Sequence, residues 1–520
     1  MIEIVERATL ETKQFNLDFK NNKDLDTQTR RDTGKSLPPK NDSDINRNTE
    51  DLAKYPVVYI DGVMIQSNQI IKLELFNDSF VPSLKLSFSD PTSKLIDENY
   101  PLDNSIISIF KESPNKDLMA IKMDFKITDF TIIKGKKDSE GISFELDGIV
   151  DVDGFYLNNF ESYKGSSYKV IKDLSKNLGL GFATNVTTTN DEMVWINPSN
   201  YRIKFMKEII ERSYINDDTF LFGYIDFYYN FNYVDIEEQL KDDISNQMNM
   251  MDREQLIKDG KDDKTPLILT NDEDAKSTNM YISKYTILNS STNINLQYGY
   301  RNKAIYYIKS EDQIKRYDLD NITNDGDNKI ALKGNPDDKN GLYENMISNT
   351  YMGKMDTDNV HKEYLHTLLQ NQNNLKFLQK LKMTIKLTRP NFSLYRFQKV
   401  LVELYNIAKL SKSNELKVVD DKNVGRNDEK IINKLSGEWL ITAINFTFSK
   451  EEGNYQEITL VKRELTDKYT FPRRKTTKDE INQKSEPKSR VTEEEKVNNI
   501  PDSKKNIDVK FASEKKKLKN

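Results

Sequence analysis

The sequence predicts an α+β protein that is mainly β, with two small antiparallel β-barrels, an intervening α+β domain and polar insertions. Short runs of β-branched and aromatic residues, several alternating with a period of two, occur in two separate regions of the chain. A helical spacing of apolar residues is clearest between these regions. The 520 residues also exceed one domain at roughly 150 residues per domain, so several cores are expected.

The first barrel is expected over residues 55–157. Asn, Asp and Pro residues separate its strands, and they favour turns because Pro fixes φ while Asn and Asp bond to nearby backbone. A charged loop over Lys134–Gly141 separates the last two strands. The expected strands are Val57–Ile60, Ile70–Phe76, Leu84–Phe88, Ile106–Phe110, Ile121–Ile127 and Ile142–Leu146.

Residues 158–237 are predicted to form the small α+β domain. Apolar residues at steps of three and four predict two amphipathic helices, each preceded by a residue suited to cap it. The aromatic and β-prone segment after them predicts a hairpin. The expected elements are a helix from Ser166 or Ser167 to Gly179, a helix from Ser199 or Asn200 to Ser213, and a strand hairpin over Thr219–Val234.

The second barrel is predicted over residues 375–465, after an insertion region over residues 238–374. Residues 238–275 and 309–374 are polar and broken by Gly and Pro, which is typical of surface insertions. Strands near 281–308 are candidates to join the second barrel. The expected strands are Tyr281–Leu288 and Ile294–Ile308 in the insertion, and Leu381–Leu387, Lys399–Tyr405, Trp439–Phe448 and Gln456–Val461 in the barrel.

The two predicted barrels share a hairpin pattern. Ile127–Ile132 reads Ile-Thr-Asp-Phe-Thr-Ile, and Ile441–Phe446 reads Ile-Thr-Ala-Ile-Asn-Phe. Each segment is followed by a charged loop, a glycine (Gly141 or Gly453) and an alternating strand. The copies lie 314 residues apart at the first strand and 312 apart at the glycine. We therefore expect two barrels related by duplication, with hairpins that superpose.

Both ends of the chain are polar. Residues 1–54 are predicted to be a polar N-terminal arm, since segment 11–54 has no sustained apolar period. Residues 466–520 are predicted to be a basic extended tail with 16 Lys or Arg and 10 Asp or Glu. Its charge of +6 leaves −11 on the other 465 residues of a chain whose net charge is −5. A solvated tether and a segment that orders on a partner are both open.

Several kinds of chemistry lack the residues they need. The chain has no cysteine, which excludes disulfides, thiol nucleophiles and thiolate metal sites. His361 and His366 are five residues apart, about 140° around a helix, so we interpret them as surface residues of an amphipathic helix. Gly179-Leu-Gly181 follows a predicted helix instead of opening one, unlike a phosphate loop. Asp325–Asn328 lacks the downstream glutamate of a calcium loop and is interpreted as a turn.

We predict that the protein is not an enzyme, that it uses no cofactor, and that it has no catalytic, cofactor-binding or metal-binding residues. Trp195 is interpreted as core packing, and Trp439 as filling a core or a subunit seam. No secretory signal is visible at the start, and no stretch approaches the ~20 apolar residues of a membrane-spanning helix. The balanced charge argues against a protein that coats nucleic acid.

The order of these parts carries a resemblance. A barrel, an α+β unit with Ser-Tyr-Lys-Val-Ile-Lys-Asp-Leu near its first helix, an aromatic hairpin and a second barrel closing in Trp439–Arg463 follow one another. This order resembles the baseplate central hub proteins of contractile phage tails and, more distantly, the hub portion of type VI secretion spike proteins. The resemblance covers residues 55–237 and 375–465, and Ile203–Tyr214 and Phe220–Val234 also support it. The arm, the insertions and the tail depart from the family.

The resemblance implies a homotrimer with two barrels in each chain. Such a ring of six similar units would join a sixfold tail tube, through its initiator protein above, to a threefold membrane-puncturing spike below, and would contact other baseplate proteins. It also implies a place in the virion tail baseplate after synthesis in the host bacterial cytoplasm, without stable membrane insertion. DNA would pass through the lumen without specific binding, and an acidic body suits this because it repels phosphates.

Two other functions are open at this stage. A tail-associated peptidoglycan hydrolase would need a cleft with converging carboxylates. A receptor-binding tail protein would present loops that bind host glycan and would make no stable contact with tube protein. These features distinguish both alternatives from a hub.

Overall fold

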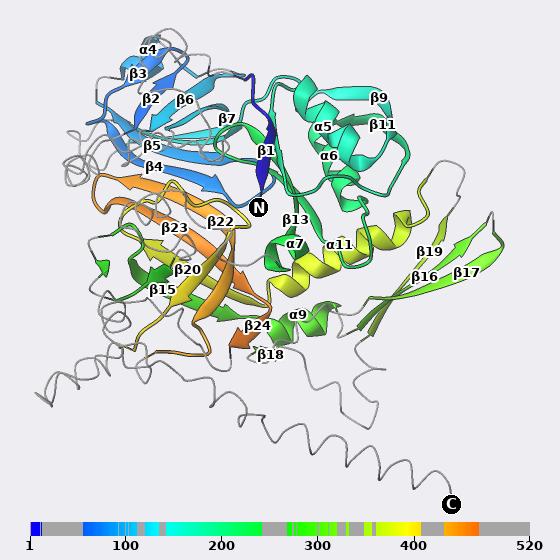
Figure 1. Ribbon diagram of the computed structural model, residues 1–520. Coiled ribbons are helices and arrows are strands. Elements are labelled where there is room, and N and C mark those ends of the chain that lie inside the picture. The colour runs from blue at the N-terminus through cyan, green and yellow to red at the C-terminus, as the bar shows by residue number, and fades with distance from the viewer. Residues whose placement is uncertain are drawn as a thin grey trace, which may run out of the picture. The chain divides into compact units, whose positions relative to one another are not determined.

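The computed structural model places part of the chain, shown as coloured ribbon in Figure 1. It describes residues 2–10, 12, 56–91, 93–98, 100–101, 103–111, 120–134, 142–241, 268–272, 275–276, 278–298, 301–309, 311–319, 329–331, 348–355, 360–406 and 431–466. All described residues belong to one compact unit, Met1–Tyr469. Most of the predicted arm, nearly all of the predicted tail and the Asp325–Asn328 segment lie outside the described residues.

A sheet of 13 strands dominates the first unit. Its strands are β2 (Val57–Ile60), β3 (Val63–Ile65), β4 (Ile70–Asn77), β5 (Ser83–Asp90), β6 (Ile106–Lys111), β7 (Ile121–Lys134), β8 (Ile142–Val150), β14 (Ile268–Thr270), β15 (Ile282–Asn289), β20 (Leu381–Leu387), β21 (Lys399–Glu403), β22 (Gly437–Ser449) and β23 (Gly453–Lys462). The main path runs β15-β20-β23-β22-β4-β5-β8-β7-β6-β2-β3, and β21 also pairs with β22 and with β14. Each of the predicted barrel strands falls within one of these strands except Lys399–Tyr405, which extends two residues past the end of β21 at Glu403.

The sheet is continuous, whereas the sequence predicted two separate barrels. The joining strand is β22, which is 13 residues long. Its first part, Gly437–Leu440, pairs with β21, and its last part, Ile444–Ser449, pairs with β4. A strand of this length extends beyond its own half of the sheet, so its end provides an edge for the other half (Figure 1).

The two halves of the sheet share one strand order. The first half runs β4-β5-β8-β7-β6 and the second runs β15-β20-β23-β22-β21, with every neighbouring pair antiparallel. When the five strands of each half are numbered by their order along the chain, their order in the sheet is 1-2-5-4-3 in both halves. The predicted duplication is therefore confirmed at the level of strand order.

An α+β unit lies between the two halves in the sequence. Its elements are β9 (Asn158–Gly165), α5 (Ser167–Asn177), β10 (Gly181–Thr184), β11 (Met193–Tyr201), α6 (Arg202–Glu211), β12 (Leu221–Ile225), β13 (Asn230–Asp235) and α7 (Ile236–Lys241). Strand β1 (Glu3–Glu6) from the N-terminus completes its sheet in the order β1-β10-β13-β12. The polar arm thus begins with a paired strand, which the prediction for residues 1–54 did not contain.

The helices of this unit follow local sequence signals. Ser166 caps α5 by accepting a hydrogen bond from the Lys169 backbone N–H at 3.5 Å, and Gly179 ends the turn with a φ of +73°. The amphipathic face of α5 buries Val170, Ile171 and Leu174. Helix α6 begins at Arg202, later than predicted, because the preceding residues continue β11 in a ribbon with β9.

The insertion region contains regular elements. Besides β14 and β15, they are α9 (Ser291–Tyr298), β16 (Arg301–Ile308), β17 (Gln313–Leu319), β18 (Lys329–Ala331), β19 (Ser348–Met355) and α11 (Tyr364–Leu378). Two short elements lie outside the insertion: α4 (Lys94–Glu98) in the first half, and β24 (Glu464–Thr466), which pairs with β18. The expected strand over Ile294–Ile308 is wrong in its first part. The Asn289 side chain accepts a hydrogen bond from the Ser291 backbone N–H at 3.1 Å, and a helix starts there.

Candidate assembly interface

The joint between the sheet halves is formed by the last six residues of β22 and by β4. The register places Phe446 opposite Leu75 and Phe448 opposite Leu73. These four side chains are almost completely buried, with Phe446 3% exposed and Leu75 0% exposed. Backbone pairing and apolar burial therefore hold the two halves together, although 367 residues separate Asn77 from Ile444.

The α+β unit packs beneath this joint. The Phe446 ring lies 4.7 Å from the Phe392 ring and 5.8 Å from the ring of Phe227, which lies at the tip of the β12–β13 hairpin. The Ile225 backbone N–H donates to the Phe80 carbonyl at 2.9 Å, so backbone bonding also connects the hairpin to the chain after β4. The aromatic hairpin predicted from the sequence is thus a support for the joint.

Arg396 connects three parts of the structure. Its guanidinium donates to the Thr442 carbonyl of β22 at 2.7 Å and to the Asn77 Oδ1 at the end of β4 at 3.2 Å. It also donates to the carbonyl of Ser79 and lies over the ring of Tyr224, 4.5 Å from the ring centroid. A planar cation with several donors suits such a junction because it satisfies carbonyls from separate segments at once.

Burial sets the electrostatics of this junction. Arg396 is buried, and desolvation lowers its pKa to about 10, so it stays charged near neutral pH. The next residue, Phe397, has a φ of +60°, which is unusual for a residue other than glycine. Its ring lies edge-on to the Tyr224 ring at 5.6 Å. The chain is held in a strained turn at the position where the three parts meet.

A second connection joins the α+β unit to the second half of the sheet. Arg463, just after β23, forms a two-armed ion pair with Glu237 in α7, one arm of which measures 2.9 Å. Both side chains are largely buried, and Glu237 is nearly inaccessible. Because two parallel hydrogen bonds fix the relative orientation of the groups, this pair sets how α7 lies against the sheet.

Asp235, which precedes α7, gives a pH-dependent prediction. Burial is the main cause that raises the pKa of Asp235 to about 6, above its ordinary value of 3.8. A raised pKa in the folded state means that this carboxyl favours folding below about pH 4 and loses that contribution as the pH rises through about 6. We expect Asp235→Asn to remove this slope. Urea unfolding of both proteins at pH 4.5 and pH 7 checks it, and an unchanged difference between the two pH values would contradict it.

The hairpins of the two halves correspond residue by residue. In β7 the pairing with β8 is interrupted between Ile127 and Asp129, and in β22 the pairing with β23 is interrupted between Ile441 and Ala443. The bulged residue is a threonine in both. Thr128 donates to the Asp147 carbonyl at 3.2 Å, and Thr442 donates to the Thr459 carbonyl at 3.2 Å.

The same correspondence holds on the other strands. The first strand of each half is interrupted after its first residue, at Ile70 in β4 and Ile282 in β15. The backbone N–H of Ile127 donates to Ser105, and that of Ile441 donates to Gln398, both at 3.0 Å. The offsets of 314 and 312 residues predicted from the sequence hold throughout the hairpins. The halves are therefore two copies of one five-stranded pattern with one register.

Three residues singled out in the sequence, Trp195, Trp439 and His361, are buried. Trp195 is buried and donates from Nε1 to the Gly165 carbonyl at 3.0 Å, and Trp439 is buried in β22, as predicted. The interpretation of His361 as a surface residue is wrong. It precedes α11, is buried with its Nε2 2.9 Å from the Arg212 carbonyl oxygen, and burial lowers its pKa. The side chain of His366 lies outside the described residues.

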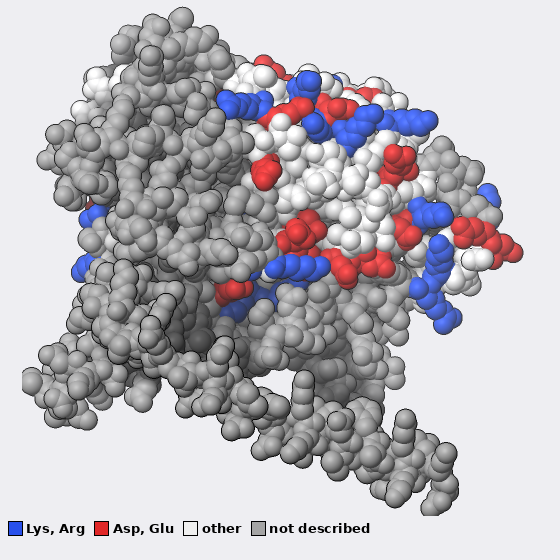
Figure 2. All heavy atoms as spheres, in the orientation of Figure 1, with Lys and Arg blue, Asp and Glu red and all other residues white. Residues whose placement is uncertain are grey.

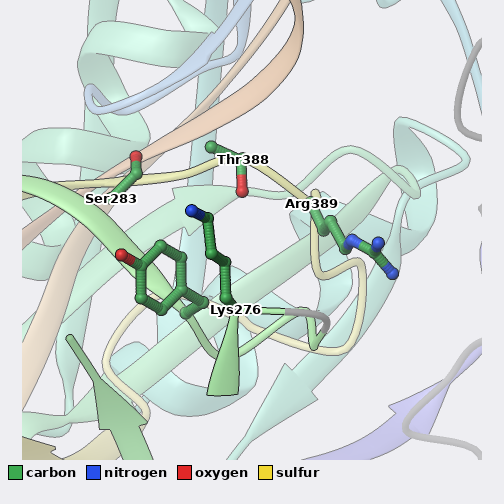
Figure 3. Close-up of a pocket in the computed structure, with 5 residues that line it drawn as sticks. Lys276, Ser283, Thr388 and Arg389 are labelled. Atoms are coloured by element: carbon green, nitrogen blue, oxygen red, sulfur yellow. The ribbon is translucent and has the colours of Figure 1, made fainter. Parts of the chain in front are cut away.

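One open pocket, with a volume of about 640 Å³, lies at the start of β15 and the end of β20. Lys276, Tyr281, Ser283, Thr388 and Arg389 line it. Figure 3 shows the Arg389 guanidinium pointing away from Lys276, so the two cations do not converge on one point. Within the part of the chain that the structure describes, no three His, Asp or Glu side chains are placed to hold a metal ion.

The visible charged surface is mixed. Figure 2 shows acidic and basic side chains interspersed on the described part of one face. Within the described residues, no helix has the length and apolarity needed to cross a membrane.

The sequence analysis did not identify Arg396, because a single arginine in Tyr395-Arg-Phe-Gln398 has no pattern that marks it as a connecting residue.

The similarity to known proteins is structural. No family model matches the sequence, and no curated protein matches it. A tail protein from Neisseria meningitidis MC58 has a TM-score of 0.42 and 11% identity, and the match covers 79% of this chain and 97% of that one. The 43 kDa tail protein of prophage MuSo2 from Shewanella oneidensis has a TM-score of 0.44 and 9% identity, covering 78% of this chain and 98% of that one.

A third solved structure comes from a secretion system. It is an E. coli component of the type VI secretion system, described as similar in structure to the T4 bacteriophage tail proteins gp27 and gp5. Its TM-score is 0.36 with 9% identity, and the match covers 79% of this chain and 77% of that one. These neighbours are of the two kinds that the sequence resembles, tail proteins and type VI secretion proteins.

Proposed function

We propose that this chain is a structural hub protein of a contractile phage tail baseplate. In this proposal three chains form a ring that joins a sixfold tail tube to a threefold membrane-puncturing spike and lines the DNA channel. The observation that supports it most is the internal repeat, two five-stranded patterns with one strand order and one register. The order of parts in the sequence, which resembles that of hub proteins, supports it as well.

The repeat matters because of symmetry. A homotrimer of a chain without a repeat presents three equal surfaces to its neighbours. A chain with two equivalent sheet halves presents six, and a ring of six matches a sixfold tube while the whole chain keeps threefold contacts for the spike. In this proposal the partners are the tube initiator protein, the spike protein and other baseplate proteins, and the chain resides in the virion.

A structural role also agrees with the way the buried polar groups are used. The carboxylate of Asp191, which is fully buried, accepts hydrogen bonds from the Ser167 backbone N–H at 2.8 Å and from the Tyr214 backbone N–H at 2.8 Å. The Ser167 hydroxyl donates to the same carboxylate at 2.5 Å. These groups hold α5 and the chain after α6 together, which is a packing task and not that of a reactive group open to substrate.

The oligomeric state is the first prediction from this proposal. We expect the full chain, alone or with its spike partner, to have the mass of three chains of 60.6 kDa in native mass spectrometry and light scattering. Class averages by electron microscopy should show a ring with six similar lobes. A monomer at all concentrations up to high micromolar with the spike present would exclude the hub, and turnover of purified peptidoglycan would favour the hydrolase instead.

A further inference from the structure

Residues 2–10 dock on the α+β unit, although the sheet half that begins with β2 follows them in the sequence. Within them, β1 runs antiparallel to β10, with Ile4 opposite Ala183. The other side of β10 pairs with β13. Residues 13–55, which the structure does not describe, lie between this segment and β2. The position of the segment on β10 is therefore set by its own contacts and not by a short connection to the sheet.

The surface that holds the segment is shaped for a backbone. The Gly179 carbonyl accepts hydrogen bonds from the backbone N–H groups of Thr9 and Leu10 at 2.8 and 3.0 Å, and from the Thr9 hydroxyl at 3.3 Å. A Cβ at Gly181 would lie only 2.8 Å from the Ala8 backbone nitrogen. Because glycine has no Cβ, it lets the segment approach this closely. The Gly179-Leu-Gly181 motif singled out in the sequence is therefore a contact surface for an extended segment.

One side chain anchors the segment. Ile2 is the only buried residue among residues 2–10. It is 2% exposed and belongs to a buried apolar cluster that includes Tyr224, Phe397 and Leu440. Val5 lies where the pairing with β10 is interrupted, and it is 45% exposed. The segment thus combines backbone pairing along a strand edge with one apolar residue in a pocket.

An ion pair accompanies these contacts. The Lys172 ammonium in α5 lies 3.3 Å from a carboxylate oxygen of Glu6. Both side chains are about 30% exposed, and ion pairs that are open to water contribute little. The backbone hydrogen bonds and the burial of Ile2 therefore supply most of the binding.

We infer that the edge of β10 is a binding site for an extended peptide, and that residues 2–10 are the ligand, which the chain itself carries. In strand addition of this kind, main-chain hydrogen bonds give affinity and a side-chain pocket gives selectivity. The bound segment also covers an edge that would otherwise be open to other strands. The inference concerns the α+β unit and goes beyond the proposed hub function, on which it does not depend.

Binding of the segment is coupled to the junction that holds the two sheet halves. The cluster that contains Ile2 also contains Phe397, next to Arg396, and Leu440 in β22. The Phe397 backbone N–H donates to the Ile441 carbonyl at 2.6 Å. A ligand that binds only the folded state stabilises it, so release of the segment should speed hydrogen exchange at the Phe397 amide as well as along β10.

The test cuts the full chain after it has folded. The recognition site of a specific protease, flanked by glycines, is inserted between Arg30 and Arg31, and the purified protein is then cleaved. We expect the fragment that carries residues 2–10 to elute with the rest of the chain in gel filtration. An excess of a labelled synthetic peptide of residues 2–12 should replace it, which fluorescence anisotropy and native mass spectrometry both report.

Two variant peptides provide a matched pair. Ile2→Ala should weaken binding to the cut protein at least about tenfold, because it removes most of a fully buried side chain. Val5→Ala should change the affinity by no more than about threefold, as expected for a position that is half exposed. Hydrogen exchange at the Phe397 amide should be slow with the original peptide bound and faster in its absence.

Three results would overturn the inference. In the first, the cut protein releases the fragment and takes up no labelled peptide. In the second, it unfolds as the fragment leaves, which circular dichroism reports, and the segment is then an integral part of the fold and not a ligand. In the third, the two variant peptides bind equally well. The oligomeric state of the uncut chain tests the proposed hub separately.

Discussion

Replacing Arg396 by leucine is expected to destabilise the protein by at least about 3 kcal/mol, since hydrogen bonds to a charged group contribute about 1.5–3 kcal/mol each. The substitution leaves the carbonyl of Thr442 and the side chain of Asn77 without their buried donor. The measurement is the midpoint of the first unfolding transition in urea. The part released first should be the joint between β4 and β22, which hydrogen exchange reports locally.

A matched control is Arg389→Leu, in the open pocket at the end of β20. That substitution should change stability by no more than about 0.5 kcal/mol, as for most surface positions. Arg396→Lys keeps the charge but not the planar fork, so an intermediate loss is expected. If the two leucine substitutions have equal effects, Arg396 does not hold the joint.

The second large effect is expected from Phe446→Ala. Removing a buried phenylalanine costs about 3–5 kcal/mol, and here the ring packs against Leu75 across the joint and against Phe392 below it. The loss should appear at all protein concentrations, because the joint lies within one chain. Thermal and urea unfolding of dilute protein are the measurements.

The repeat supplies the control for this prediction. Ile132 occupies the same place in the first half but is 40% exposed. Ile132→Ala should leave the stability of the dilute chain within about 0.5 kcal/mol of the original. Equal loss from both substitutions in dilute protein would mean that the two positions are not related in this way.

Local patterns predicted much of this fold. The alternation in Leu381–Leu387 gave strand β20 with its bounds, and Ser166 and Gly179 gave both ends of α5. The sequence analysis overlooked one local signal. Ile294–Tyr298 was expected to begin a strand, yet it lies in α9, whose start is marked by the hydrogen bond from the Ser291 backbone N–H to the Asn289 side chain.

The candidate interface was predictable only in part. The threonine shared by Ile127-Thr128 and Ile441-Thr442 marked the repeat, because both bulges need the same side-chain bond. The joint itself was not predictable, since nothing in Ile444–Ser449 indicates pairing with a strand more than 360 residues earlier. Likewise His361 has polar neighbours in the sequence, but the fold buries it beside the ring of Trp195.

The joint between β4 and β22 also has a consequence for the order of events on the ribosome. Strand β4 is complete at Asn77, whereas the residues that cover its edge begin at Ile444. At a synthesis rate of about 5–20 residues per second, the interval is about 20–70 s. During that time the edge is open, and a nascent chain on a neighbouring ribosome presents the same edge. Until the last hairpin emerges, pairing with another nascent chain through this edge therefore competes with correct folding, the kind of hazard that chaperones limit.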